Sequence, residues 1–200
     1  GPGGISLQPE DQIKKAGAGG KYIVNMESRL VDSAGNTVTE AGVVGELAIK
    51  GETIMKEYYK NPEATREAIK DGWVYSGDLG TMDDEGYITL VDRKKDMIIT
   101  GGENVYSKEV EDAIFENPKI TSAVIIGVPH PEWGETVMAV ATLNEGQTLT
   151  LEELREFLKP RIADYKIPRL LEVVDALPMN VSGKVLKYQL RDRFKNKAGG

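Results

Sequence analysis

The stretch Asp92-Arg93-Lys94-Lys95-Asp96 divides this sequence into two parts with different patterns. From Lys21 to Asp92, short apolar segments alternate with turn residues, which is typical of an antiparallel sheet. Beyond Arg93, helix and strand patterns alternate over about a hundred residues, the size of a small domain. The sequence therefore predicts two domains, residues 1–92 and residues 93–200, with a hinge near Lys95.

Three strands and one helix are predicted in the first part. Asn61 and Pro62 predict a helix start, because Asn caps helices and Pro suits their first position, and Asp71-Gly72 predicts the stop. The strands are expected at residues 22–31, 43–50 and 87–91, with turns at residues 33–36 and 83–86. The fold class predicted is α+β, a distorted antiparallel β-barrel-like subdomain followed by a small α+β domain.

The second part carries three predicted helices. Ser107 is expected to cap the first, and Thr150 and Glu153 have the spacing of a capping box for the second. The last helix is expected to place Leu186, Leu190 and Phe194 on one stripe. Strands are expected at residues 123–128, 136–143 and 170–174.

Composition excludes several classes of function. The net charge of −7 opposes nucleic-acid binding, which needs a surplus of Lys and Arg. With no cysteine and one histidine, the chain has neither a thiolate nucleophile nor the ligands of a zinc centre, so no metal site is predicted. No apolar run approaches the ~20 residues of a membrane span, and we expect a cytoplasmic protein. Residues 1–4 and 199–200 are interpreted as remnants of protein expression or a frayed end.

Four segments contain candidate functional residues, each with an ordinary structural alternative. Asp78 lies between two glycines and could accept the hydroxyls of a ribose, or it could be a turn aspartate that bonds its own backbone. The charged stretch 92–96 could be a hinge in which Arg93 reaches a nucleotide, or a solvated turn. The pair Gly101-Gly102 could form a hairpin tip or line a narrow ligand channel.

Lys184 follows a Gly-containing loop ahead of the last helix and could be delivered to an anionic centre, although most lysines are simply solvated. His130 has no neighbouring nucleophile or second ligand, so no role is assigned to it. Neither a nucleophilic triad nor a metal site can be assembled from this sequence.

Taken in order, these segments resemble the C-terminal signature of the adenylate-forming (AMP-binding) enzyme superfamily, over almost the whole chain. The stretches Asp92-Arg93-Lys94-Lys95-Asp96 and Gly101-Gly102-Glu103-Asn104-Val105-Tyr106 are most similar to fatty-acyl-CoA synthetases. The other matching stretches are residues 45–51, 58–65, 75–78, 134–135 and 182–184.

The resemblance implies a two-step reaction, in which ATP converts a carboxylic acid to an acyl adenylate and CoA then displaces AMP. It implies that Asp78 and Arg93 bind the nucleotide, that Lys95 is the hinge, and that Lys184 neutralises charge on the α-phosphate during adenylation. The segment Gly101 to Glu103 would face the pantetheine channel of CoA.

Two departures from the family pattern affect these expectations. Ser107 replaces a common proline, and the family's phosphate loop and Thr-Glu magnesium motif are not found. The resemblance places these motifs and the acid pocket upstream, so we expect an N-terminal part of the same enzyme as a partner, with the ligands for Mg²⁺, and no activity from this chain alone. A truncated paralogue that acts only as a binding module and a ligase that loads a carrier protein remain alternatives.

Overall fold

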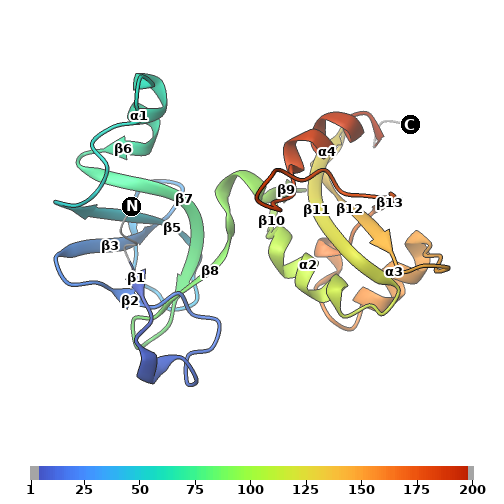
Figure 1. The fold of residues 1–200 in the computed structure, drawn as a ribbon, viewed down its shortest axis with the longest axis horizontal. Coiled ribbons are helices and arrows are strands. Elements are labelled where there is room, and N and C mark those ends of the chain that lie inside the picture. Colours follow the sequence, from blue (N-terminus) through green and yellow to red (C-terminus); the bar gives the residue numbers. More distant parts are fainter. Residues whose placement is uncertain (1–4, 198–200) are drawn as a thin grey trace. The chain divides into compact units, whose positions relative to one another are not determined.

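The structure is a computed structural model that describes residues 5–197. The interpretation of residues 1–4 and 199–200 as expression remnants falls outside the described residues. The chain forms two compact units, which divide between Lys95 and Asp96 (Figure 1). Within the described residues, no helix has the length and apolar character needed to span a membrane.

The first unit is built on an antiparallel sheet in which β7 is the central strand. Strand β7 pairs with β5 along one edge, and with β6 and β8 at different points along its length. The strands are β3 (Met26–Val31), β4 (Thr37–Val38), β5 (Gly45–Gly51), β6 (Ile69–Lys70), β7 (Trp73–Met82) and β8 (Ile88–Arg93). A separate ribbon pairs β1 (Ile5–Ser6) with β2 (Lys21–Tyr22).

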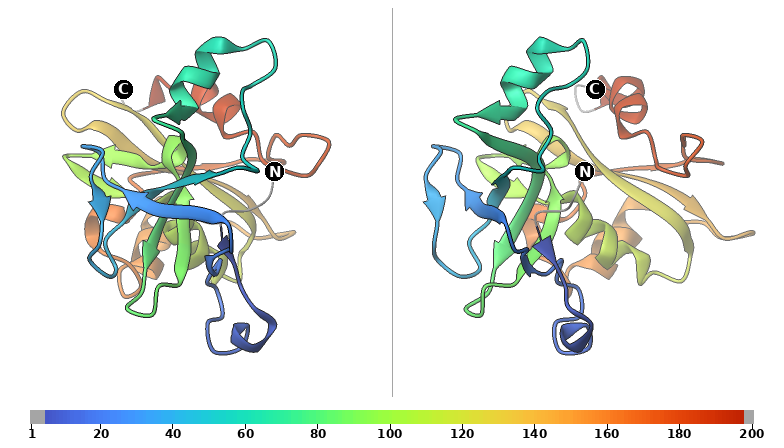
Figure 2. Two further views of the ribbon diagram at one scale, coloured as in Figure 1. Left: turned by 90° about the vertical axis from the view of Figure 1, so that its left-hand side faces the viewer. Right: turned by 60° about the vertical axis from the view of Figure 1, so that its left-hand side comes forward.

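The barrel-like form predicted for this unit is not confirmed. Among the described residues, the sheet follows the order β4-β3-β5-β7-β6 and has two free ends. Its core is small, with Leu30, Leu47 and Ile88 buried together. The predicted strand 22–31 is interrupted, because Asn25 adopts a positive φ of 70° and separates β2 from β3. Figure 2 shows the dark-blue loop that carries the short helix η1 (Pro9–Asp11) extending from the edge of this unit.

Helix α1 (Pro62–Ala68) begins as predicted, because the Asn61 side chain accepts the backbone N–H of Ala64 at 3.1 Å. Its end differs in detail from the expectation. Asp71 and Gly72, with φ of 52° and 78°, form the two-residue turn between β6 and β7, since both central residues of such a turn need positive φ. The short strand β6 therefore lies between the helix and the predicted stop.

The second unit contains a mixed sheet covered on both faces. The sheet order is β10-β9-β12-β11, and β13 runs parallel to β12. The strands are β9 (Ile98–Thr100), β10 (Glu103–Val105), β11 (Ile120–His130), β12 (Gly134–Leu143) and β13 (Leu170–Val173). The helices are α2 (Ser107–Phe115), α3 (Leu151–Leu158) and α4 (Lys187–Phe194), with the short turn η3 (Asp164–Lys166). The short turn η2 (Lys94–Asp96) contains the last residues of the first unit and the first residue of the second.

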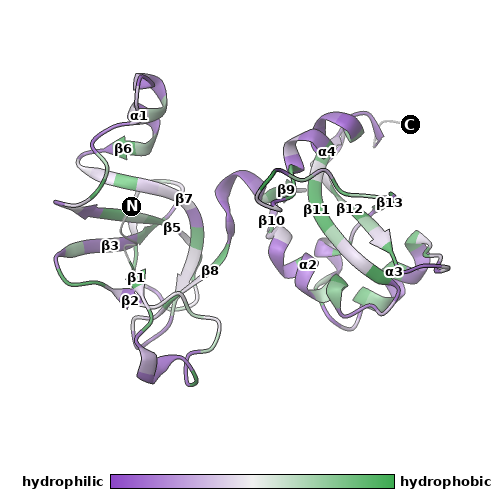
Figure 3. Cartoon of the chain, viewed as in Figure 1, coloured by the Kyte–Doolittle hydropathy of each residue, from purple (hydrophilic) through white to green (hydrophobic). Residues whose placement is uncertain are grey.

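Strands β11 and β12 read as continuous apolar segments because each face of the sheet is buried under helices. On one face, Ile125 packs in a cluster with Ile114 of α2 and Leu154 of α3. On the other face, Ile126 packs in a cluster with Leu190 and Phe194 of α4. Figure 3 shows hydrophobic residues along β11 and β12, and both hydrophilic and hydrophobic residues in the helices.

Helix starts in this unit agree with the sequence at one position and differ at another. The capping box is confirmed: Thr150 Oγ1 accepts the N–H of Glu153 at 3.1 Å, and Glu153 accepts the N–H of Thr150 at 2.9 Å. Ser107, however, is not a cap. It is the first residue of α2 after Tyr106, fully buried, and its Oγ accepts a hydrogen bond from Lys187 Nζ at 2.7 Å.

Candidate active-site elements

Asp78 lies inside β7, so it is not the turn aspartate that was the alternative to a ribose-binding role. Glu46 pairs with Leu79 and Ala48 with Tyr75, so a single residue of β5 faces Ser76, Gly77 and Asp78 of β7. These residues form a bulge, which Gly77 permits with a φ of 74°. The bulge carries Asp78 out of regular strand geometry while keeping it on the central strand.

Asp78 and Arg93 are brought together by the pairing of β7 with β8. The two residues are direct partners in the register, and Arg93 Nε donates to Asp78 Oδ1 at 3.0 Å. A carboxylate offers several acceptor positions and a guanidinium five donors, so this pair retains capacity for a ligand. Two residues that are 15 positions apart in the sequence thus form one polar site.

Glu46 is a buried acid beside this polar site that sequence reasoning did not single out. It is almost fully buried, and its carboxylate accepts the N–H of Gly77 at 3.1 Å and the ammonium of Lys94 at 2.8 Å. It therefore ties the bulge to the residues after β8. The available signal was an acid inside the apolar segment 43–50, since acids are almost never buried without partners.

A pocket of about 350 Å³ adjoins this polar site. It is lined by Ser76, Gly77, Arg93, Lys94 and Lys95. Lys95 is exposed, lies in the single turn η2 and is the last residue of the first unit. The pocket therefore combines a backbone segment without a side chain, at Gly77, with three cationic side chains, a composition suited to an anionic ligand.

In the second unit, Lys184 lies at an exposed hairpin turn that Asn180 organises. Asn180 Oδ1 accepts the N–H of Ser182 at 3.0 Å, the hydroxyl of Ser182 at 2.8 Å and the N–H of Lys184 at 2.9 Å. Gly183 has a φ of 77°, and Met179 and Val185 pair across the turn. A rigid turn thus presents a long and exposed cationic side chain.

The base of the Lys184 turn is anchored through α4. Lys187 donates to Ser107 Oγ and lies 2.7 Å from Glu111 Oε1, with both charged side chains about 16% exposed. Arg191 donates from both terminal nitrogens to Asp96 Oδ1 at 3.1 Å. Neither anchor was expected from the sequence, because the partners lie 76 or more positions apart.

Gly101 and Gly102 form a hairpin tip between β9 and β10. Their φ values of 59° and 88° are those of a two-residue turn with positive φ at both positions. A Cβ on Gly102 would meet nothing within 4 Å, so packing within this chain does not require the glycine. Glu103 begins β10 beside the tip and is exposed.

The tip adjoins Trp133, whose backbone carbonyl accepts the N–H of Gly101 at 3.0 Å. The indole is stacked on His130 at 4.2 Å, with the guanidinium of Arg169 3.5 Å from its ring centre. His130 Nδ1 accepts the N–H groups of Glu132 and Trp133, so the histidine is a structural residue of this turn. Tyr106, which follows β10, has its pKa raised by burial, partly opposed by a hydrogen bond with Asn104.

Comparison with known proteins identifies the family. Residues 109–184 match the family described as AMP-binding enzyme C-terminal domain. The chain belongs to the AMP-binding enzymes. It is 42% identical to feruloyl-CoA synthase of an Amycolatopsis species over 96% of this chain and 39% of the relative. It is 38% identical to the long-chain-fatty-acid–CoA ligase FadD13 of Mycobacterium tuberculosis, over 96% of this chain and 38% of the relative.

A solved structure supports the same assignment. The o-succinylbenzoate CoA synthetase MenE of Bacillus subtilis, in complex with its acyl-adenylate intermediate, is similar with a TM-score of 0.85 and 35% identity, over 96% of this chain and 39% of that chain. The chain spans about 39% of the length of such relatives. The resemblance to AMP-binding enzymes inferred from the motifs is therefore confirmed.

Metal-ligating side chains are not clustered among the described residues of this chain. Among residues 5–197, no group of three or more His, Asp or Glu side chains is placed to hold a metal ion.

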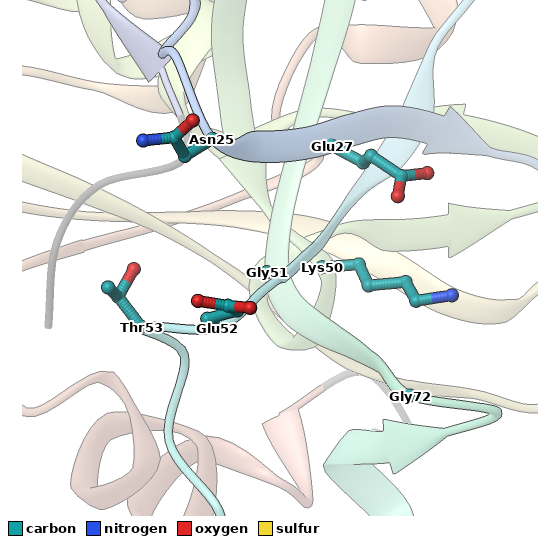
Figure 4. A pocket seen from close by; sticks show the side chains of 7 residues that line it. All are labelled: Asn25, Glu27, Lys50, Gly51, Glu52, Thr53 and Gly72. Atoms are coloured by element: carbon teal, nitrogen blue, oxygen red, sulfur yellow. The ribbon is translucent and has the colours of Figure 1, made fainter.

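A second pocket, of about 710 Å³, lies at the end of β5 that is remote from Glu46 (Figure 4). Glu27 and Lys50 are cross-strand partners that extend in the same direction beside it, an arrangement of opposite charges that is common on exposed sheets.

Proposed function

We propose that this chain works as part of an AMP-forming acyl-CoA synthetase. In the first step a carboxylate attacks the α-phosphate of ATP, which forms the acyl adenylate and releases pyrophosphate. In the second step the thiol of CoA attacks the acyl carbonyl and AMP leaves. The observation that carries this proposal is the exposed Lys184 at the tip of an ordered turn, in a chain that belongs to the AMP-binding enzymes.

Lys184 is the proposed catalytic residue of the first step. Its ammonium would lie between the carboxylate of the acid and the α-phosphate oxygens, where negative charge increases in the transition state. A preformed cation at that point lowers the barrier without reorganisation of solvent. The hydrogen bonds of Asn180 support this role, because they fix the backbone and leave only the lysine side chain to be placed.

Asp78 and Arg93 are the proposed nucleotide-binding residues of the first unit. Asp78 would accept the ribose hydroxyls, and Arg93 would hold the carboxylate in place and add a cation beside the phosphate. Their 3.0 Å contact and the adjoining cationic pocket support the assignment. Lys95 is the proposed hinge, supported by its exposure in one isolated turn between β8 and β9.

Gly101, Gly102 and Glu103 are the proposed wall of the pantetheine channel. The tip is exposed and free of side-chain bulk, so a thin ligand can approach its backbone. We propose that polypeptide beyond these 200 residues supplies the phosphate-binding groups, the ligands for Mg²⁺ and the acid pocket. The share of its relatives that the chain spans, about 39%, supports this division.

A fatty acid is the proposed substrate, because the stretches 92–96 and 101–106 resemble fatty-acyl-CoA synthetases. The relative named feruloyl-CoA synthase makes an aromatic acid the main alternative. CoA is the proposed acceptor, in preference to a carrier protein. Parallel assays with fatty and aromatic acids, and with CoA or a carrier protein as acceptor, would separate these choices.

The decisive test is Lys184→Ala in the enzyme that carries this chain. We expect adenylation, measured as acid-dependent pyrophosphate release, to fall by roughly 10²–10³-fold, the usual cost of removing one preorganised charge. Thioester formation from pre-made acyl adenylate should stay near the wild-type rate. The matched control is Lys195→Ala, which removes another exposed lysine near the same helix. Equal losses in both steps would contradict the role of Lys184.

A further inference from the structure

Glu135 fills a gap that Gly127 leaves in the sheet of the second unit. Gly127 pairs with Val137, and Glu135 with Pro129, so Glu135 lies on the same face as the side chain that Gly127 lacks. A Cβ at Gly127 would lie 2.7 Å from Glu135 Oε1 and 2.9 Å from its Cδ. The carboxylate can occupy this position only because residue 127 is glycine.

From that position the carboxylate reaches the neighbouring strand. Glu135 Oε2 accepts the backbone N–H of Ile99 at 3.1 Å. Ile99 belongs to β9, the strand that leads into the Gly101-Gly102 tip. Strand β9 pairs with β12 only at Thr100 and Gly134. The Glu135 side chain adds a contact between the two strands at Ile99, the residue before Thr100.

We propose that Glu135 is a positioning residue that holds the Gly101-Gly102 tip, with Gly127 as the space that accommodates it. The pairing of Thr100 with Gly134 joins β9 to β12, and two hydrogen bonds flank it, from the N–H of Gly101 to the carbonyl of Trp133 and from the N–H of Ile99 to Glu135. The Glu135 contact is the side-chain anchor on the β9 side of this pair, and its loss should leave the strand before the tip less restrained. The inference rests on the proposed function, in which this tip borders pantetheine.

The consequence is a selective effect on the second half-reaction. Ile99 is about half exposed, so water can replace the lost acceptor and the fold should survive removal of Glu135. A displacement of the order of 1 Å in a positioning element can still cost up to about 10²-fold in rate. The adenylation step, which uses Lys184 on a different loop, should be unchanged.

Three variants test the contact from different directions. Glu135→Ala removes the acceptor. Gly127→Ala leaves Glu135 intact but places a methyl group where its carboxylate lies. Glu135→Gln keeps an oxygen acceptor of the same length and should restore wild-type behaviour. The control is Glu132→Ala, an exposed acid three residues away in the connection that precedes β12.

The first measurement is amide hydrogen exchange of Ile99 in the 200-residue chain, which requires no activity. Loss of one hydrogen bond should speed exchange of Ile99 by up to about tenfold in Glu135→Ala and Gly127→Ala, but not in Glu135→Gln or Glu132→Ala. Exchange at the buried Ile125 amide, which donates to Glu111, reports whether the sheet is still folded. Unchanged exchange at Ile99 in the first two variants would overturn the proposed contact.

The second measurement is thioester formation from pre-made acyl adenylate in the enzyme that carries this chain. We expect Glu135→Ala and Gly127→Ala to lose about 10–10²-fold, through a higher KM for CoA or a lower kcat, with normal adenylation. The double variant should lose no more than either single variant, because both remove one contact. Normal thioester rates alongside faster Ile99 exchange would refute the positioning role and leave the proposed function standing. Absence of CoA ligase activity in the unsubstituted enzyme would refute the proposed function, and the role of Glu135 with it.

Discussion

Arg191→Met is expected to destabilise the second unit through the loss of a single ion pair. Both terminal nitrogens of Arg191 lie 3.1 Å from Asp96 Oδ1, and the two side chains are 30% and 14% exposed. Asp96 is the first residue of this unit, and α4 contains Arg191 near its last turn. Met preserves much of the apolar stem of Arg, so the substitution mainly removes the charge and its donors.

The magnitude follows from the partial burial of the pair. Removing one member of a fully buried pair costs about 3–5 kcal/mol, because the other charge stays buried without its partner. An exposed pair is worth about 0–1 kcal/mol. The exposure of Arg191 and Asp96 lies between these limits, so we expect a loss of about 2 kcal/mol. For a domain of about a hundred residues this lowers Tm by roughly 10 °C.

The assay is urea unfolding followed by the fluorescence of Trp133. The chain contains two tryptophans, so a Trp73→Phe background leaves Trp133 as the reporter for the second unit. The matched control is Lys195→Met. It breaks the pair between Lys195 and Asp192, whose side chains are 57% and 77% exposed, and should change stability by less than about 0.5 kcal/mol.

A double-mutant cycle with Asp96→Asn provides the decisive comparison. If Arg191 and Asp96 stabilise the unit through each other, the two single variants share most of their cost, and the coupling energy should be at least about 1 kcal/mol. Additive losses would refute the pair as the cause. Equal losses for Arg191→Met and Lys195→Met would refute the argument from burial.

Two further predictions address the hairpin tip and the acid stability of the first unit. Gly102→Leu should impair thioester formation more than adenylation. The control is Gly146→Leu, which forces a side chain into a similarly open turn with φ of 74° and should impair neither step. Equal effects of the two substitutions would assign the loss to backbone strain. A hydrogen bond from Lys15 holds the pKa of Asp83 in the folded state below its ordinary value. Asp83 therefore stabilises the folded state at pH values above its unfolded pKa of about 3.9. This stabilisation is lost as the pH falls through the lower folded pKa. Asp83→Asn should therefore reduce stability at pH 7, and its cost should shrink as the pH falls below about 3.9, as measured by urea unfolding across that range.

The sequence predicted the secondary structure best where local chemistry was sufficient. Asn61 and the pair Thr150 and Glu153 cap helices in the structure, because capping depends on residues within one turn of each other. The apolar segments of β11 and β12 predicted strands because an apolar stretch of that length, bounded by turn residues, suits a sheet buried on both faces. The order of the motifs along the chain was also sufficient to indicate the family, because that order requires no knowledge of the fold.

The errors arose where distant residues decide the local conformation. Ser107 has the chemistry of a cap, but its hydroxyl contacts Lys187, which lies 80 positions away, and the helix begins at Ser107 after Tyr106. Asp78 suits a loop, yet two neighbouring strands keep it in β7 and a bulge accommodates it. The barrel-like form is not confirmed, since strand pairing, which the apolar pattern does not encode, leaves the described sheet open at β4 and β6.

The sequence alone determined which residues carry the proposed chemistry, because Lys184, Asp78, Arg93 and the glycine pair belong to motifs whose order is itself informative. Only the tertiary structure decided which groups support them. The carboxylate of Glu46 holds the bulge beside Asp78, Asn180 orders the turn of Lys184, and Glu135 reaches β9 through the space at Gly127. Most of these contacts join strands or turns that are remote in sequence, and hydrogen bonds act over about 3 Å in space, whatever the separation along the chain.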